Sequence, residues 1–514
     1  MRVQNGSDWS LLQVPPVDFV TPKSDSILGT WTDLREREHE TGVRPGQWIL
    51  VRVADRPDPE VSAFCNSLSF QQRAEGTQLA YLRDLKVFFD FLRIRGKTWR
   101  DAATADVEDY EFWRRRDPDN PRRVSGSKFN RELAALNLFY AFQVRRGSVK
   151  FSPVRLHRVT GRDGNLVAVP ALRSKRKQPS RVNWLTPAAY RKWNLVGLGG
   201  YNAGGLRDES WRGRNDGRNL AFTEFLWASG LRLQEASSLL LNEVPTNSGD
   251  KLHLRGRLSG ATTKSGAGRD FWVSARAVSL IEGYVMSTRQ FAVDRARGEG
   301  RYESVRGIRI VTRFIGKTRI RYVDPSGLTG EVSLNQVGPE ERLRLYTDGA
   351  DGPEPLALWL TDAGLPMKHP SWQAVFRLAN KRVEAEGLRT DVGALVCRPH
   401  MLRHSFALRM LVTMQHLFDR RLNLTSSERK AYLYQFGDVW TLVAQLLGHK
   451  NPETTRTEYL VPVQGLQLDH LLNGAPEEAN EIAGLLSHIA AESGLVHDAP
   501  TVVRDHPANA GEDE

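Results

Sequence analysis

The sequence predicts a mainly α-helical protein that also contains a small β-sheet, an α+β fold with two main domains. Apolar residues recur every three to four positions over 79–92 and 127–146, which is the spacing of amphipathic helices. KLHLRGR at 251–257 and FWVS at 271–274 flank a turn-forming stretch, so we expect a β-hairpin there. Helical patterns return over 370–472. The chain has 514 residues, enough for more than one hydrophobic core.

The N-terminal part is expected to hold an irregular arm followed by a helical unit. Residues 1–60 contain six prolines and little periodicity, so we predict an arm of unclear role with one short element at most. Residues 61–165 carry the two long helices, each ended by a glycine, and two shorter helical segments near 62–72 and 104–116. The aromatic residues of these helices are expected to pack in a core.

A basic linker at 166–184 precedes the second domain, which we expect over 185–472. Thr186 followed by Pro187 is typical of a helix N-cap and first turn, so the domain is predicted to start there. Inside it, a helix near 220–242 leads into the hairpin.

The second domain is interrupted by a basic insertion at about 292–360 and followed by an acidic tail at 473–514. Within the insertion, residues 295–321 hold nine bases against two acids. The pattern around Gly316 predicts two strands, so we read this segment as an inserted subdomain.

Charge is unevenly distributed along the chain. The formal net charge is +12, but residues 475–514 carry nine acids and one base, and residues 1–60 carry ten acids and seven bases. Residues 61–474 therefore hold 64 bases against 41 acids, a surplus of 23. Such a surplus favours a polyanionic partner, most commonly nucleic acid, over a basic surface that is merely solvated.

Several other classes of protein and site are disfavoured. Two cysteines, Cys65 and Cys397, cannot build a disulfide framework or a cysteine zinc site, and they fit a cytoplasmic protein. No stretch of 18 apolar residues exists and the N-terminus lacks an apolar signal core, so we expect no membrane span and no secretion. His400 and His404 have zinc-protease spacing, but no glutamate lies between them and Arg403 would repel a dication. We therefore expect neither a metal nor a cofactor.

Four separated segments carry residues that make chemical sense together. They are GLRLQE at 230–235, the predicted hairpin turn, HMLRH at 400–404, and LLGHKNPETTRTEY at 446–459. The candidate catalytic residues in these segments are Arg232, Lys264, His400, Arg403, His449 and Tyr459.

This set suits phosphoryl transfer from a phosphodiester. Arg232 and Arg403 can bind the non-bridging phosphate oxygens through planar guanidinium groups, which stabilises the charge that develops in the transition state. Tyr459 would be the nucleophile, with His400 as the base that takes its proton. Lys264 would then protonate the departing 5′ oxygen. His449 would add a hydrogen bond to the phosphate, and His404 is expected to make a structural hydrogen bond.

On these motifs the sequence resembles the tyrosine recombinase (phage integrase) family over about 61–470. The resemblance implies a helical core-binding domain at 61–165 and a mixed α/β catalytic domain at 185–472 that carries the six residues. It further implies a site-specific recombinase or integrase, as in a mobile element, that cuts and rejoins DNA through a 3′-phosphotyrosine link without ATP or metal. The implied partners are double-stranded DNA, three further subunits in a homotetramer on DNA, and accessory DNA-bending proteins. The implied location is the cytoplasm, in association with the nucleoid.

Two alternatives remain open at this level. A type IB topoisomerase would use a similar site to relax DNA, and a DNA-binding regulator could keep the fold without catalysis. Lys251 and Arg269 flank the same predicted hairpin as Lys264, so they compete with it for its role. The insertion, which is longer than is usual in the family, would contact DNA or a neighbouring subunit, or be a plain surface addition.

Overall fold

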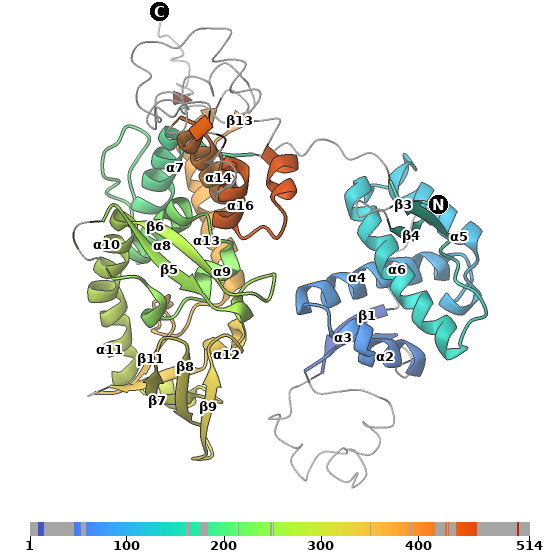
Figure 1. Ribbon diagram of the computed structural model, residues 1–514, viewed down its shortest axis with the longest axis horizontal. Coiled ribbons are helices and arrows are strands. Elements are labelled where there is room, and N and C mark those ends of the chain that lie inside the picture. The colour runs from blue at the N-terminus through green and yellow to red at the C-terminus, as the bar shows by residue number, and fades with distance from the viewer. Residues whose placement is uncertain are drawn as a thin grey trace, which may run out of the picture. The chain divides into compact units, whose positions relative to one another are not determined.

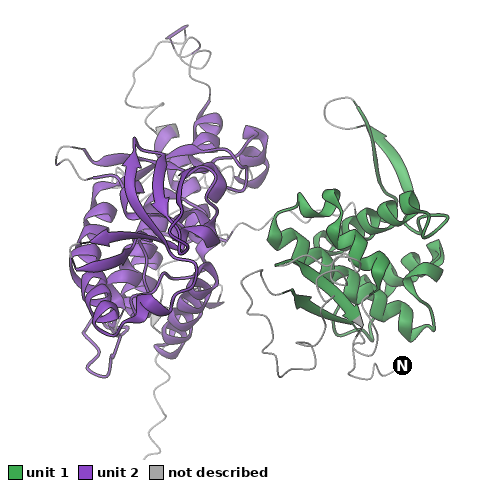
Figure 2. Cartoon of the chain, turned by 90° about the horizontal axis from the view of Figure 1, so that it is seen from below, with its two compact units in different colours: residues 1–179 green, residues 180–514 purple. Residues whose placement is uncertain are grey.

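The computed structural model describes most of both predicted domains. The described residues are 9–14, 46–52, 58–160, 165–174, 183–213, 215–246, 249, 251–349, 351–390, 393–416, 427–428, 430, 438–459 and 501–502. The chain divides into two compact units, 1–179 and 180–514 (Figure 2). Most of the predicted arm, the centre of the linker and all of the acidic tail except 501–502 lie outside the described residues.

Unit 1 consists of helices and two small antiparallel sheets of two strands each (Figure 1). Its helices are α2 (Pro59–Asn66), α3 (Leu68–Gln71), α4 (Glu75–Ile94), the 3₁₀ turn η2 (Trp99–Asp101), α5 (Thr104–Arg115) and α6 (Gly126–Arg146). All four predicted helical segments are thereby confirmed. The α6 helix ends at Gly147, whose left-handed φ of 78° suits a glycine C-cap.

Aromatic side chains fill the core of unit 1, as predicted. Phe88, Phe89, Phe139 and Tyr140 are almost completely buried, and the Phe89 and Phe139 rings meet edge to face at 5.4 Å between centroids. A buried ion pair joins α5 to α6, with Arg114 Nη2 2.7 Å from Glu132 Oε1.

The region predicted as an irregular arm contributes two strands to unit 1. β1 (Trp9–Gln13) pairs antiparallel with β2 (Trp48–Arg52), and Trp9 packs on Phe89 of α4 at 5.1 Å between ring centroids. The expectation of one short element at most was therefore wrong. The two strands are separated by more than thirty residues, and local periodicity carries no information about so distant a pairing.

The second antiparallel sheet of unit 1 includes residues that the sequence places in the linker. β3 (Leu156–Thr160) pairs antiparallel with β4 (Leu166–Pro170), so residues 166–170 are a strand and not a connecting segment. The outer parts of both strands are largely exposed.

Unit 2 combines helices with small sheets (Figure 1). Its helices are α7 (Pro187–Gly199), α8 (Asp216–Ser229), α9 (Leu233–Ser237), α10 (Ala275–Tyr284), the π-helical turn η5 (Val285–Arg289), α11 (Gln290–Gly298), α12 (Pro339–Arg342), α13 (His369–Ala385), α14 (Pro399–His416), α16 (Val439–Leu447) and a helix over 452–459. Shorter 3₁₀ turns are η3 (Leu241–Glu243), η4 (Gly260–Thr262) and η6 (Arg301–Ser304). The predicted helix start is confirmed, because the Thr186 side chain accepts the Ala189 N–H at 3.1 Å as an N-cap.

The predicted helix near 220–242 is two helices and a turn. Gly230 ends α8 with a φ of +63°, and a side chain there would clash with Phe406, whose ring lies 2.2 Å from an added Cβ. Only glycine suits this position, so α8 stops and the chain turns before α9 begins.

The predicted hairpin and insertion strands are present. β5 (His253–Leu258) pairs antiparallel with β6 (Arg269–Ser274). The insertion folds as a five-stranded sheet in the order β11-β10-β7-β8-β9, and a third sheet has the order β13-β12-β14. The bounds of these strands are β7 (Arg309–Ile315), β8 (Arg319–Val323), β9 (Thr329–Ser333), β10 (Leu345–Gly349), β11 (Gly352–Pro355), β12 (Leu388–Thr390), β13 (Gly393–Ala394) and β14 (Thr501–Val502).

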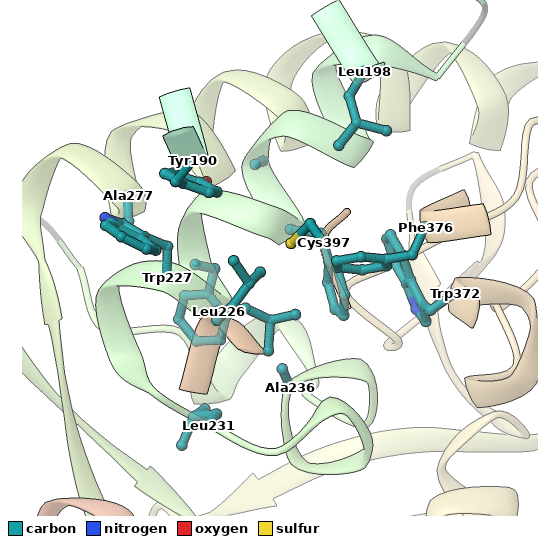
Figure 3. Close-up of a cluster of buried hydrophobic side chains, with 14 of the residues drawn as sticks. Tyr190, Leu198, Leu226, Trp227, Leu231, Ala236, Ala277, Trp372, Phe376 and Cys397 are labelled. Carbon is teal, nitrogen blue, oxygen red and sulfur yellow. The ribbon is translucent and has the colours of Figure 1, made fainter. Parts of the chain in front are cut away.

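The core of unit 2 holds α7, α8 and α13 together (Figure 3). Tyr190 stacks on Trp227 at 4.2 Å between ring centroids, and Phe222 stacks on Trp372 at 3.5 Å. This rigid base supports the turn after α8, where the first of the candidate catalytic residues lies. Among the described residues, no helix is both long and apolar enough to span a bilayer.

Candidate active site

Arg232 occupies the N-cap of α9, directly after the glycine turn. Its backbone N–H donates to Glu235 Oε2 at 2.9 Å, and its Nη1 donates to Glu235 Oε1 at 2.9 Å. The carboxylate therefore closes the first turn of α9 and orients the guanidinium at the same time. About 30% of the Arg232 side chain stays exposed, so it can still reach a ligand.

Glu235 also binds a second arginine, Arg269 at the start of β6. Arg269 Nη2 lies 2.7 Å from Glu235 Oε2, and its Nη1 donates to the Leu446 carbonyl at 3.0 Å. Burial by itself would raise the pKa of Glu235, but Arg269, the Arg232 N–H and the Arg232 charge outweigh it and the pKa is lowered. Glu235 is thus an ionised group that holds β6, α9 and α16 together. The sequence predicts only a competition of Arg269 with Lys264, because no local pattern marks the contact with Glu235.

Arg403 is buried inside α14 and ties three segments together. Its Nη1 donates to the Gly230 carbonyl at 2.7 Å and its Nη2 to the Leu447 carbonyl at 2.6 Å. Burial and the nearby Arg232 charge lower the pKa of Arg403 to about 10, so it remains a cation at neutral pH. Arg232, Arg269 and Arg403 thus face one carboxylate, Glu235. This excess of positive charge suits an anionic ligand such as a phosphodiester.

Tyr459, the proposed nucleophile, is fully buried and contacts His404. The Tyr459 hydroxyl lies 2.6 Å from His404 Nδ1, and the His404 ring stacks on His400 at 4.3 Å between centroids. Burial raises the pKa of Tyr459 above its usual value, although the charges of Arg403 and Arg232 act to lower it. The structure therefore brings Tyr459 into the field of both arginines, and the imidazole that touches it is His404.

The histidine pair is neutral near physiological pH. Burial lowers the pKa of His404 to about 3, with further contributions from His400, Arg403 and His449. Burial also lowers the pKa of His400, with contributions from Arg403, Arg232 and Lys264. A neutral His404 ring with its proton on Nε2 can accept the Tyr459 O–H at Nδ1. The expected structural hydrogen bond of His404 is thus made to the proposed nucleophile.

His449 follows α16 directly, at the end of a glycine C-cap. Gly448 has a φ of +66°, and an added Cβ would lie 2.2 Å from the Arg269 side chain. His449 Nδ1 lies 2.8 Å from Thr455 Oγ1, and burial together with the charges of Arg403 and Arg232 lowers its pKa to about 4. His449 comes two residues after Leu447, whose carbonyl accepts from Arg403, so His449 lies next to the same cationic cluster.

Lys264 lies in the exposed turn that connects β5 to β6. Its charge is the smallest of the contributions that lower the pKa of His400. Within the described part of the chain, its side chain makes no hydrogen bond or ion pair that fixes it. Lys264 is thus free to follow a ligand.

No three His, Cys, Asp or Glu side chains of the described residues converge in a way that could hold a metal ion. Both cysteines are buried and unpaired. The expectation of a metal-free reaction stays a prediction.

Lowering the pH should destabilise the protein through His404 and His449. Both rings have pKa values well below 6.5, so the unfolded chain takes up protons below that pH that the folded protein does not bind. The free energy of unfolding should therefore fall between pH 6.5 and about 4.5, by at most about 1.4 kcal/mol per pH unit for each ring. Urea unfolding at several pH values measures this slope.

His449→Asn should flatten the slope, while His253→Asn, at an exposed position in β5, should leave it unchanged. An unchanged slope in His449→Asn would contradict the assignment of this ring as a buried neutral group.

The chain is similar to several known proteins. Residues 61–147 match the family described as phage integrase, N-terminal SAM-like domain. Tyrosine recombinase XerC of Roseiflexus sp. (strain RS-1) is 24% identical over 299 residues, which is 57% of this chain and 82% of the relative. Tyrosine recombinase XerD of Lacticaseibacillus casei is 23% identical over 279 residues, 54% of this chain and 81% of the relative.

Solved structures give weaker similarities. The XerH site-specific recombinase bound to palindromic difH substrate, a post-cleavage complex, has a TM-score of 0.42 and 12% identity, and the match covers 82% of this chain and 91% of that one. A lambda integrase dimer bound to a COC′ core site has a TM-score of 0.37 and 12% identity, with coverage of 76% and 74%.

The N-terminal family match and the curated relatives agree on one class of protein, the DNA strand-transferring enzymes. Within that class, this chain is similar to the tyrosine recombinases XerC and XerD.

Proposed function

We propose that the protein is a site-specific DNA recombinase or integrase that cuts and rejoins strands through a 3′-phosphotyrosine intermediate. The observation that carries this proposal is the convergence of Arg232, Arg403 and Tyr459 from three separated segments. Both arginines are cations that act on the Tyr459 phenol, and Arg403 is held by two backbone carbonyls. A preorganised pair of guanidinium groups beside a phenol suits attack on a phosphodiester.

The cleavage step uses the six candidate residues in separate roles. Tyr459 Oη attacks phosphorus while Arg232, Arg403 and His449 hold the non-bridging oxygens. The bond between phosphorus and the 5′ oxygen breaks, and Lys264 gives a proton to that oxygen. The products are a 3′-phosphotyrosyl strand and a free 5′-hydroxyl.

The phenol proton leaves toward the histidine pair. We expected His400 to be the base, yet the imidazole nitrogen that contacts the Tyr459 hydroxyl is Nδ1 of His404. In this conformation the hydroxyl is closed to solvent, so Tyr459 has to leave His404 before it can reach a phosphate. His400, one turn earlier on α14, is then the base for the displaced phenol.

Rejoining reverses the same steps with the 5′-hydroxyl of a different strand. Each phosphodiester is replaced by a phosphotyrosyl ester and restored, so no nucleotide cofactor is consumed. We propose a homotetramer on double-stranded DNA as the active assembly, with accessory DNA-bending proteins as further partners.

The experiment that tests the function is covalent trapping on nicked DNA in the presence of EDTA. Wild-type protein should form SDS-resistant adducts and recombinant products, because the arginines replace a metal. Adducts that vanish with EDTA would contradict the metal-free mechanism. Supercoil relaxation by a monomer, without a recombinant product on any pair of sites, would instead identify a topoisomerase.

DNA binding should depend steeply on salt. If the basic body of the chain makes six to ten phosphate contacts, affinity should fall by about 10³ to 10⁵ between 50 and 200 mM salt. Fluorescence anisotropy measures the slope of log K against log salt. Tyr459→Phe should keep the slope, because the phenol carries no charge. A slope near zero would exclude a phosphate-dominated interface.

A further inference from the structure

The insertion contacts the loop that carries Lys264. This loop, residues 259–268, connects β5 to β6. Asn335, which follows β9 in the insertion, accepts two consecutive backbone N–H groups of the loop. Its Oδ1 accepts from Gly260 at 3.1 Å, and its main-chain carbonyl accepts from Ala261 at 3.1 Å.

The loop is compact, so the hydrogen bonds that fix its first residues also restrain Lys264. Thr263 Oγ1 donates to the Ala267 carbonyl at 2.9 Å, across the turn that contains Lys264. Gly260 packs against the far side of the loop, where an added Cβ would lie 2.7 Å from the Gly266 carbonyl oxygen. The residues before and after Lys264 therefore move together with Gly260.

A buried arginine fixes the insertion beside this loop. All five N–H groups of Arg342 are used. They reach the carbonyls of Ser238, Leu334 and Val337 and both carboxylate oxygens of Glu243, at 2.6 to 3.1 Å. Glu243 Oε1 also accepts the Ser259 hydroxyl at 2.8 Å. One ion pair thus joins the end of α9, the Asn335 segment and the first residue of the Lys264 loop.

Asn335 is itself held on both sides by buried neighbours. Leu334 and Val337 lie in a small core with Leu240 and Ile320, and the Leu334 N–H donates to the Thr318 carbonyl at 2.7 Å. The Asn335 side chain is exposed, but its backbone cannot shift without opening this core. The contact therefore runs from a rigid segment to the buried base of the loop, whose other half, from Lys264 to Gly268, is largely exposed.

We infer that Asn335 is a positioning residue that holds the Lys264 loop in place for protonation of the departing 5′ oxygen. The insertion then contributes to catalysis by positioning this loop and is not a plain surface addition. This inference rests on the proposed function, in which Lys264 supplies that proton. A general acid has to be placed within hydrogen-bond distance of the atom it protonates, so loosening its loop should slow cleavage more than DNA binding.

Hydrogen exchange on the free protein tests the contact directly. In Asn335→Ala the Gly260 N–H loses its acceptor, so amides of 259–268 should exchange faster than in wild type. Gln336→Ala, at the exposed neighbouring position, is the matched control and should leave the loop unchanged. Unchanged exchange in Asn335→Ala would overturn the inference.

Single-turnover cleavage tests the role of the contact in catalysis. On a duplex that carries the site mapped with wild-type adducts, Asn335→Ala should lower the cleavage rate at saturating DNA about 10- to 100-fold, with little change in binding. Asn335→Asp keeps an Oδ1 acceptor and should restore most of the rate. Gln336→Ala should cleave like wild type.

A substrate with sulfur in place of the bridging 5′ oxygen separates positioning from general damage. A thiolate leaves without being protonated, since thiols have pKa values near about 8.5. Lys264→Ala and Asn335→Ala should therefore both regain cleavage on this substrate. If the cleavage defect of Asn335→Ala persisted on this substrate while Lys264→Ala was rescued, the inference about Asn335 would be overturned and the proposed function would stand. If wild type formed no adducts, or Lys264→Ala cleaved the oxygen substrate normally, the proposed chemistry itself would fail.

Discussion

Tyr459→Phe should abolish covalent protein–DNA adducts and leave DNA binding intact. The substitution removes one oxygen from a ring that is fully buried among α14 and α16 residues, so the fold should persist. No other hydroxyl contacts His404 in the described residues, and without the phenol no phosphotyrosyl ester can form. Adduct yield on nicked duplexes should fall below detection, while the dissociation constant should stay within about twofold.

The stability of Tyr459→Phe shows whether the fold is kept. Loss of the hydrogen bond to His404 should change the free energy of unfolding by about 1 kcal/mol, because the ring keeps its packing. Persistent adducts in Tyr459→Phe would show that a different residue is the nucleophile. Joint loss of adducts and binding would instead indicate a structural role for the hydroxyl.

Arg403→Ala should produce the second large effect, a loss of cleavage of about 10² to 10³-fold beyond any loss of folded protein. The guanidinium is the most buried cation beside Tyr459, and it also bonds the carbonyls of Gly230 and Leu447. Leaving these two buried acceptors unpaired should cost roughly 2 to 4 kcal/mol of stability. Rates measured below the unfolding transition, per folded molecule, separate the two losses.

Arg409→Ala is the matched control on the same helix. Arg409 is partly buried, its pKa is also lowered to about 10, and its Nη2 donates to the Trp227 carbonyl at 2.8 Å. Its guanidinium lies over the Trp227 ring and not beside Tyr459. Arg409→Ala should therefore lose stability but retain cleavage per folded molecule. Equal catalytic losses in the two variants would mean that Arg403 acts only through the fold.

The buried position of Tyr459 bears on the expected effects of both Tyr459→Phe and Arg403→Ala. In the described conformation its pKa is raised and its hydroxyl is bonded to a neutral imidazole, which is a poor state for attack on phosphorus. Binding of a phosphodiester to Arg232 and Arg403 would supply the negative charge that these two arginines lack as a partner. The arginines are therefore expected to matter in every step, whereas His404 matters only while the phenol is at rest.

Features that depend on near neighbours in the chain could be predicted from the sequence. The helices α4, α5 and α6, the Thr186 cap, the β5–β6 hairpin and the strands around Gly316 all follow from short-range periodicity and turn residues. Five of the six candidate catalytic residues stand out for the same reason, because each lies in a short motif with fixed internal spacing. Lys264 has no such motif, and Lys251 and Arg269 compete with it in the sequence.

The contacts that organise the site were decided by tertiary structure. Arg269 reaches Glu235 across 34 positions, Tyr459 reaches His404 across 55, and Gly260 reaches Asn335 across 75. The pairing of β1 with β2 is of the same kind. Such contacts depend on which surfaces meet when the cores form, and no local pattern specifies that. The sequence by itself therefore determined which residues could perform the chemistry, and the tertiary structure decided which of them touch and which are held back.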